Sequence, residues 1–348
     1  MKKSFIILLI TAFAVYSKVG IIINKDIIKI PHVKSAVNTY ISDLLATGEQ
    51  VWVDSTTFDD GNTRSELQQL RDSLRTYYIS ENLTGAVLIG NLPTASFEEW
   101  TKRHIKDSLG NVIDSSWEGE NYPVDYYFMD LTDQSDTAWH DSLNENTDTT
   151  DTNYPYFSGY FENYTGDKNF EIWVSRIIAH NFYHTYVDSL ENPFAEDSVI
   201  TAYLQRVHER MTAPATAPRR AMLMGDFKNW FYLNQPNIEN LNIPLITFRF
   251  PHDTPRILQR ELRKGYEWAC IYEHSQPQAH VMARDHNERT GIFHSFYHIG
   301  SNNHSLLQMI DSSTAPPKVL FYQDYGCSNV NYNFDNCLAK CMQCYKMV

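Results

Sequence analysis

The chain has 348 residues, of which 43% are hydrophobic and 14% aromatic, so it is long enough for two or three lobes with a sizeable core. Its formal net charge of −13 argues against binding nucleic acid or an anionic membrane surface, because both interactions rely on clustered Lys and Arg. All five cysteines lie after residue 269, which excludes a disulfide-rich scaffold.

The N-terminus has the pattern of a secretory signal peptide. Lys2 and Lys3 precede an apolar run from Phe5 to Val15, and Ser17 is a small residue close to the end of that run. The run is too short to cross a bilayer comfortably. We therefore expect residues 1–17 to be removed, and the mature chain to be secreted or at the cell surface, without a stable membrane span. An uncleaved N-terminal anchor is the alternative.

Strand and helix patterns alternate after the signal peptide. Residues 19–24 and 85–90 are apolar runs typical of strands buried on both faces, and residues 50–54 form a third strand pattern between them. A helical spacing of apolar residues follows the first strand, and Thr63 with Glu66 forms a capping-box pattern ahead of a second helix. This alternation predicts parallel strands joined by right-handed crossovers.

Residues 107–167 contain no Lys or Arg but many Asp and Glu residues. We interpret this segment as a solvated insertion in the first lobe. Its abundant carboxylates raise the alternative of a structural calcium ion, although they lack the ordered spacing of an EF-hand loop. We expect the protein to require no cofactor.

The second half of the chain repeats the alternation after a break. A long helix is predicted to begin near Asp197, and the Pro- and Ala-rich segment 212–220 ends it and joins two lobes. We place the first lobe at residues 18–200 and the second at residues 201–348. Thr254 is expected to cap a helix that ends at Gly265. The strands predicted around these helices are 170–177, 220–226, 243–250, 267–275 and 318–327.

Two polar residues follow apolar strand patterns in the second lobe. His274 and Cys327 are 53 positions apart (327 − 274), and the carboxyl edge of a parallel sheet is where ligands bind. If the two strands are neighbours, an imidazole there can accept the proton of a thiol, whose thiolate is a nucleophile. The backbone N–H groups of Ser275 and Cys327 could then form an oxyanion hole. Spacing alone leaves a structural role open for both side chains.

Several short motifs, in this order, resemble those of the gingipain-type cysteine peptidases, which are relatives of caspases and clostripain. The matching segments are "GAVLIGNLP", "YPVDYYFMDLTD", "EIWVSRI", "YLQRVHERM", "WACIYEHS" and "KVLFYQDYGCSN". Together they span most of the mature chain. The order of the motifs carries more weight than any one of them.

The resemblance implies an α/β, caspase-like three-layer fold of two lobes, in which mostly parallel sheets are flanked by helices. It also implies cysteine endopeptidase activity on a protein or peptide substrate. Cys327 would be the nucleophile, His274 the general base or ion-pair partner, and Glu171 the acidic residue that orients the histidine.

The sequence departs from the family pattern at two places. Ser275 follows the histidine where the family has glycine, and the chain ends soon after Cys327, where family members continue with another strand and substrate-pocket loops. We therefore expect the C-terminal part of the fold to be truncated. These departures favour an alternative function, a catalytically inactive binding or assembly module at the cell surface. Transpeptidation is a further alternative, since a thioester can pass to an amine instead of water.

Overall fold

The computed structural model describes residues 18–61, 63–106, 111–132, 139–140, 160–161, 163–166, 169–179, 196–213, 218–225, 242–249, 252–276, 279–282, 292–294, 304–305 and 319–325. The helical elements are η1 (Ile27–Lys29), α1 (Pro31–Ala46), α2 (Arg64–Glu81), α3 (Tyr126–Met129), α4 (Glu196–Thr212) and α6 (Pro255–Lys264). The strands of the first half are β1 (Lys18–Ile23), β2 (Gln50–Asp54), β3 (Leu83–Ile89), β4 (Ser96–Lys106), β5 (Val112–Pro123), β6 (Trp139–His140), β7 (Tyr160–Phe161), β8 (Asn163–Tyr164) and β9 (Trp173–Ile177). Those of the second half are β10 (Ala221–Gly225), β11 (Leu245–Arg249), β12 (Tyr266–Tyr272), β13 (His274–Gln276), β14 (Ala279–Val281), β15 (Ile292–His294), β16 (His304–Ser305) and β17 (Val319–Tyr325).

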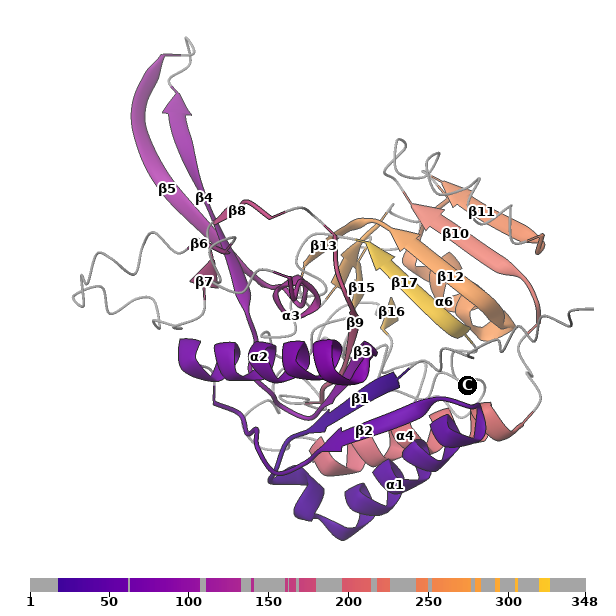
Figure 1. The fold of residues 1–348 in the computed structure, drawn as a ribbon. Helices are drawn as coiled ribbons and strands as arrows, with labels where there is room; N and C mark the ends of the chain where they lie inside the picture. Colours follow the sequence, from indigo (N-terminus) through magenta and orange to yellow (C-terminus); the bar gives the residue numbers. More distant parts are fainter. Residues whose placement is uncertain are drawn as a thin grey trace, which may run out of the picture.

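The first lobe is built on a parallel sheet with the order β2-β1-β3-β9. Neighbouring residues of β1 point to opposite faces, as the pleat requires. Ile21 belongs to the apolar cluster that includes α1 and α4, whereas Ile22 belongs to the cluster that includes α2 and α3. Figure 1 shows α2 on one side of this sheet and α1 with α4 on the other. The result is the three-layer α/β arrangement that the resemblance implied.

The second lobe contains another parallel sheet, with the order β11-β10-β12-β17. Ala269 and Ile271 of β12 pack in one cluster with Leu258 and Leu262 of α6, and the same cluster continues into the first lobe. The two lobes therefore share a continuous core. The alternate residues of β12, Cys270 among them, face a smaller apolar cluster on the opposite side of the sheet.

Helix α4 leads from the first lobe to the second and lies beside α1 (Figure 1). His208 Nδ1 lies 2.9 Å from a carboxylate oxygen of Asp43, and His32 Nε2 lies 2.7 Å from one of Asp197, so the two helices are tied near both ends. Ile200 of α4 is fully buried in the shared core. The division that we placed at residue 200 thus falls inside this helix.

Part of the acidic segment is ordered structure. Strands β4 and β5 form a long antiparallel hairpin, paired from Ser96↔Pro123 to Lys106↔Val112, which projects away from the two lobes in Figure 1. Tyr127 and Phe128 of the following α3 are fully buried against the first sheet and α2. Residues 107–167 therefore do not form only a solvated insertion, because this described portion contributes to the core.

Three of the sequence motifs meet at Arg176, which is 8% exposed. Its Nε donates to Asp125 Oδ1 at 2.7 Å, and its terminal nitrogens donate to the carbonyl oxygens of Leu92 and Pro93 at 3.3 and 2.7 Å. A buried guanidinium must find such partners, since its desolvation is otherwise costly. Three of the motifs that carry the resemblance therefore meet around one buried side chain of the first lobe. Among the described helices, none has both the length and the apolarity needed to cross a membrane.

Candidate functional site

His274 lies directly beyond the carboxyl end of the second sheet. The sequence predicted one strand through residue 275, but β12 ends at Tyr272 and His274 begins the separate strand β13. Glu273 between the two strands is completely buried, whereas the His274 side chain is exposed. The chain therefore changes direction at Glu273 and presents the imidazole at the sheet edge.

Strand β17 is the hydrogen-bonded, parallel neighbour of β12, and Tyr272 pairs with Tyr325 at their carboxyl ends. Adjacent strands lie about 4.8 Å apart. His274 comes two residues after Tyr272, and Cys327 comes two residues after Tyr325 (274 − 272 = 327 − 325 = 2). The two residues thus follow neighbouring strands, at the same distance from a pair of residues that are in register. Cys327 itself lies outside the described residues.

Ser275 is joined to a buried histidine across a short hairpin. Strands β13 and β14 are antiparallel, and Ser275 pairs directly with His280, so their side chains share one face. Ser275 Oγ lies 2.9 Å from His280 Nδ1, and His280 Nε2 lies 3.2 Å from the Tyr322 hydroxyl of β17. His280 is completely buried, and burial lowers its pKa to about 3.

Sequence reasoning alone does not point to His280 or Tyr322. The available signal was the short run "HSQPQAHV", in which two three-residue strands flank the dipeptide Pro277-Gln278. A two-residue connection is a common hairpin length and would have placed Ser275 opposite His280.

Glu171 lies two residues before β9, at the amino end of that strand. Its Oε2 accepts a hydrogen bond of 2.6 Å from the backbone N–H of Leu131, and its own N–H donates to the Met129 carbonyl at 3.0 Å. These bonds attach the start of β9 to the end of α3. A role for Glu171 in orienting His274 stays a prediction from the resemblance.

Cys270 has the features of a structural thiol. It lies in the middle of β12, is completely buried, and has its Sγ 3.5 Å from Gln323 Oε1 of β17. Burial raises the pKa of this thiol to about 12, so it carries almost no thiolate at neutral pH. The other four cysteines lie outside the described residues.

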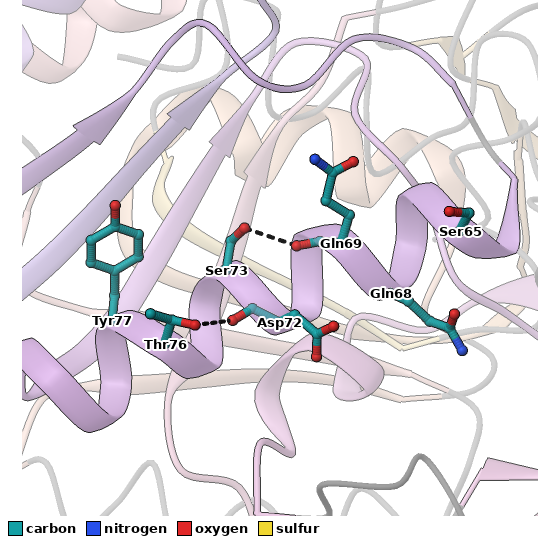
Figure 2. Close-up of a pocket in the computed structure, with 7 residues that line it drawn as sticks. All are labelled: Ser65, Gln68, Gln69, Asp72, Ser73, Thr76 and Tyr77. Carbon is teal, nitrogen blue, oxygen red and sulfur yellow. Dashed lines mark hydrogen bonds between the residues drawn. The ribbon is translucent and has the colours of Figure 1, made fainter.

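Two surface hollows are lined by described residues away from His274. Figure 2 shows the larger, of about 560 Å³, along the polar face of α2. Ser73 and Thr76 there donate their hydroxyl hydrogens to the carbonyl oxygens of Gln69 and Asp72, each at 2.8 Å, so they bond to their own helix. This surface is the hydrated side of an amphipathic helix.

The smaller hollow, of about 340 Å³, lies at the carboxyl edge of the first sheet. It is lined by Asn24, Asp26, Ile27, Ile30, Asp60, Asn91, Glu196 and Asp197. Asp26 pairs with Lys29, and Asp197 pairs with His32. Among the residues that the structure describes, no three His, Cys, Asp or Glu side chains are grouped to hold a metal ion. Much of the acidic segment lies outside this set, so the calcium alternative stays a prediction.

The two helix-flanked parallel sheets form a caspase-like α/β fold of the gingipain type. Gingipain R (RgpB), an Arg-specific cysteine proteinase, matches with a TM-score of 0.52 and 10% sequence identity over 95% of this chain and 59% of its own. The complex of the Porphyromonas gingivalis RgpB pro- and mature domains matches with a TM-score of 0.51 and 11% identity, over 95% of this chain and 60% of that one. This chain thus spans about three fifths of the length of those chains. No protein-family model and no curated protein matches it. At this identity the likeness establishes the fold, and the predicted fold class is confirmed.

Proposed function

We propose that this protein is an exported cysteine endopeptidase that uses Cys327 as nucleophile and His274 as general base and acid. The observation that carries the proposal is the pairing of β12 with β17, because His274 and Cys327 follow the paired residues Tyr272 and Tyr325 at the same offset. A thiol and an imidazole that follow neighbouring parallel strands in this way suit the proton transfer that cysteine peptidases need.

The proposed reaction has two halves. His274 takes the proton of the Cys327 thiol, the thiolate attacks the peptide carbonyl carbon, and the imidazolium returns the proton to the leaving amine as the C–N bond breaks. Water then loses a proton to His274 and attacks the thioester carbonyl. The C–S bond breaks, the acid is released, and the proton returns to the sulfur. The backbone N–H groups of Ser275 and Cys327 would stabilise the oxyanion formed in each half.

The fold of gingipain R gives additional support, since gingipain R is an Arg-specific cysteine proteinase. The proposed substrate class for this chain is a protein or peptide. The exposed position of His274 at the sheet edge allows an extended substrate backbone to approach it.

Export is proposed on the signal-peptide pattern of residues 1–17, which lie outside the described residues. Mass spectrometry of the protein recovered from outside its source cells should find an N-terminus at Lys18. A chain that starts at Met1 and stays with the membrane fraction would instead support the uncleaved anchor.

The test of the peptidase uses a peptide library together with a thiol-reactive peptide probe. The parent protein should cleave peptides and should be labelled at Cys327, and Cys327→Ala should lose both properties. Cys270→Ala is the matched control, because it removes a buried thiol and should keep both. Labelling that persists in Cys327→Ala, or a folded parent that neither cleaves nor reacts, would contradict the nucleophile assignment.

A second candidate is a non-catalytic binding or assembly module with the same fold. The observation that favours it is Ser275, whose side chain stands where the gingipain-type motif has glycine and is bonded to His280. In that case Cys327→Ala would leave binding to a captured protein unchanged. Transpeptidation differs from hydrolysis in its acceptor, so a ligated product that appears only when an amine is added would identify it.

A further inference from the structure

His280 links the two parts of the structure that carry the candidate dyad. It lies on β14, is 0% exposed, and contacts a side chain on each side. Through Nδ1 it reaches Ser275 in β13, directly after His274. Through Nε2 it reaches Tyr322 in β17, the strand that leads to Cys327.

The hydrogen bonds of Ser275 determine where the protons in this chain lie. Ser275 Oγ is 3.2 Å from the carbonyl oxygen of Glu273, which can only accept, so the single serine hydroxyl hydrogen is donated there. Ser275 Oγ must then accept from His280, which places a proton on Nδ1. The unprotonated Nε2 consequently accepts the hydroxyl hydrogen of Tyr322.

In this arrangement each hydrogen atom takes part in one hydrogen bond, and the imidazole of His280 is neutral. The complete burial of His280 favours the same state, because burial penalises the charged form and lowers its pKa. The resulting order is Tyr322 to His280 to Ser275 to the Glu273 carbonyl. Hydrogen bonds to a desolvated group are strong when that group is satisfied, and His280, the central member of this chain, is completely buried.

We propose that His280 is a positioning residue for the His274 and Cys327 dyad, acting through hydrogen bonds to both strands. Glu273 and Ser275 stand on either side of His274 in the sequence, and both take part in the chain. Tyr322 sits five residues before Cys327 (327 − 322). The chain therefore sets the distance between the backbone of His274 and strand β17. This role rests on the proposed peptidase function.

The size of the expected effect follows from how strictly reacting atoms must be placed. Catalytic groups need to be held within about 0.5 Å of their productive geometry. A displacement of about 1 Å can cost about 100-fold in rate without weakening substrate binding. Loss of the chain should therefore lower kcat and leave KM nearly unchanged.

The test compares Tyr322→Phe with Tyr266→Phe in the full chain. Both variants lose one tyrosine hydroxyl from the second sheet, but Tyr266 donates to Glu261 at 2.7 Å and has no part in the chain. We expect Tyr322→Phe to lower kcat about 10- to 100-fold on a peptide substrate, with KM within about twofold of the parent. Tyr266→Phe should keep the parent kcat per folded molecule.

A spectroscopic arm tests the chain without using activity. In the parent protein labelled with nitrogen-15 at histidine, NMR should show His280 neutral, with the proton on Nδ1, and Tyr322→Phe should shift the Nε2 resonance while Tyr266→Phe leaves it in place. His280→Gln, whose amide can donate and accept, should keep more of kcat than His280→Leu.

The outcomes separate the two proposals. A parent that cleaves while Tyr322→Phe matches Tyr266→Phe in kcat overturns the positioning role alone, as does a loss confined to KM. A proton found on Nε2 overturns the proposed direction of the hydrogen-bond chain. Absence of cleavage in the folded parent overturns the proposed peptidase function, and the positioning role fails with it. The NMR result would still decide the direction of the hydrogen-bond chain in that case.

Discussion

Gly225 offers a test of how tightly the strands beneath the candidate site are packed. It ends β10 and pairs with Tyr272, the last residue of β12. In Gly225→Ala the new Cβ would stand 2.8 Å from Tyr272 Cβ and 3.0 Å from its carbonyl carbon, and closer still to its carbonyl oxygen. Favourable contacts between carbon atoms lie at about 3.5–4.0 Å. Because two of the overlapped atoms are backbone, rotation of a side chain cannot relieve the overlap and the strands must separate.

The expected cost is that of overpacking a close-packed interior, about 1–3 kcal/mol in the free energy of unfolding. A domain of about 200 residues loses about 2–4 °C in Tm for each kcal/mol. The separation of β10 from β12 would also displace His274, two residues beyond Tyr272. A shift of about 1 Å there should lower peptide cleavage about 100-fold.

Gly20→Ala in β1 is the matched control, since it adds the same methyl group to a parallel strand of the first sheet. Its new Cβ would lie 3.3 Å from side-chain atoms of Leu83 and Trp52, which can rotate, so we expect a loss below about 1 kcal/mol. Urea denaturation followed by tryptophan fluorescence measures both variants. If Gly225→Ala has the same urea midpoint and cleavage rate as Gly20→Ala, the reasoning from close backbone approach is wrong.

Three further predictions follow from individual side chains. Cys270, whose pKa burial raises to about 12, should stay unmodified by a thiol reagent at neutral pH and react only in urea, as mass spectrometry of the digested protein would show. Thr63→Ala removes the observed capping box with Glu66 and should cost about 1 kcal/mol. Thr39→Ala in α1, a half-buried position where the hydroxyl bonds only its own helix at the Ser35 carbonyl, should stay within about 0.5 kcal/mol in the same urea assay. Burial lowers the pKa of His280 from 6.5 to about 3, so between these pH values the unfolded chain binds a proton that the folded chain does not. The free energy of unfolding should therefore fall as pH decreases from 6.5 toward 3. Urea midpoints measured across this range should fall less steeply in His280→Gln than in the parent protein.

Local sequence patterns were sufficient for most elements of the two main sheets. The apolar runs 19–24 and 85–90 correspond to β1 and β3, and Thr63 caps α2 in the predicted way. Gly265 ends α6 with a φ of 87°, a backbone conformation that glycine adopts without the steric cost of a side chain. These features depend on residues within one or two turns of each other, so the linear sequence contains the physical information.

The long hairpin of β4 and β5 was not predicted, although both strands are long. Its pairing joins residues such as Ser96 and Pro123, and it projects away from the lobes (Figure 1). Strands are recognised in a sequence by a regular alternation of apolar and polar residues, and the segment 98–106, "EEWTKRHIK", lacks this alternation.

The sequence by itself determined which residues could carry chemistry, since His274 and Cys327 each follow an apolar strand pattern. Only the tertiary structure decided that β12 and β17 are neighbours, and that β14 places His280 between Ser275 and Tyr322. The physical reason is the range of the interactions. Caps and turns form between residues close in the chain. Strand order and buried hydrogen-bond partners, such as Arg176 and the Leu92 carbonyl 84 positions apart, depend instead on which apolar faces are buried together when the whole chain folds.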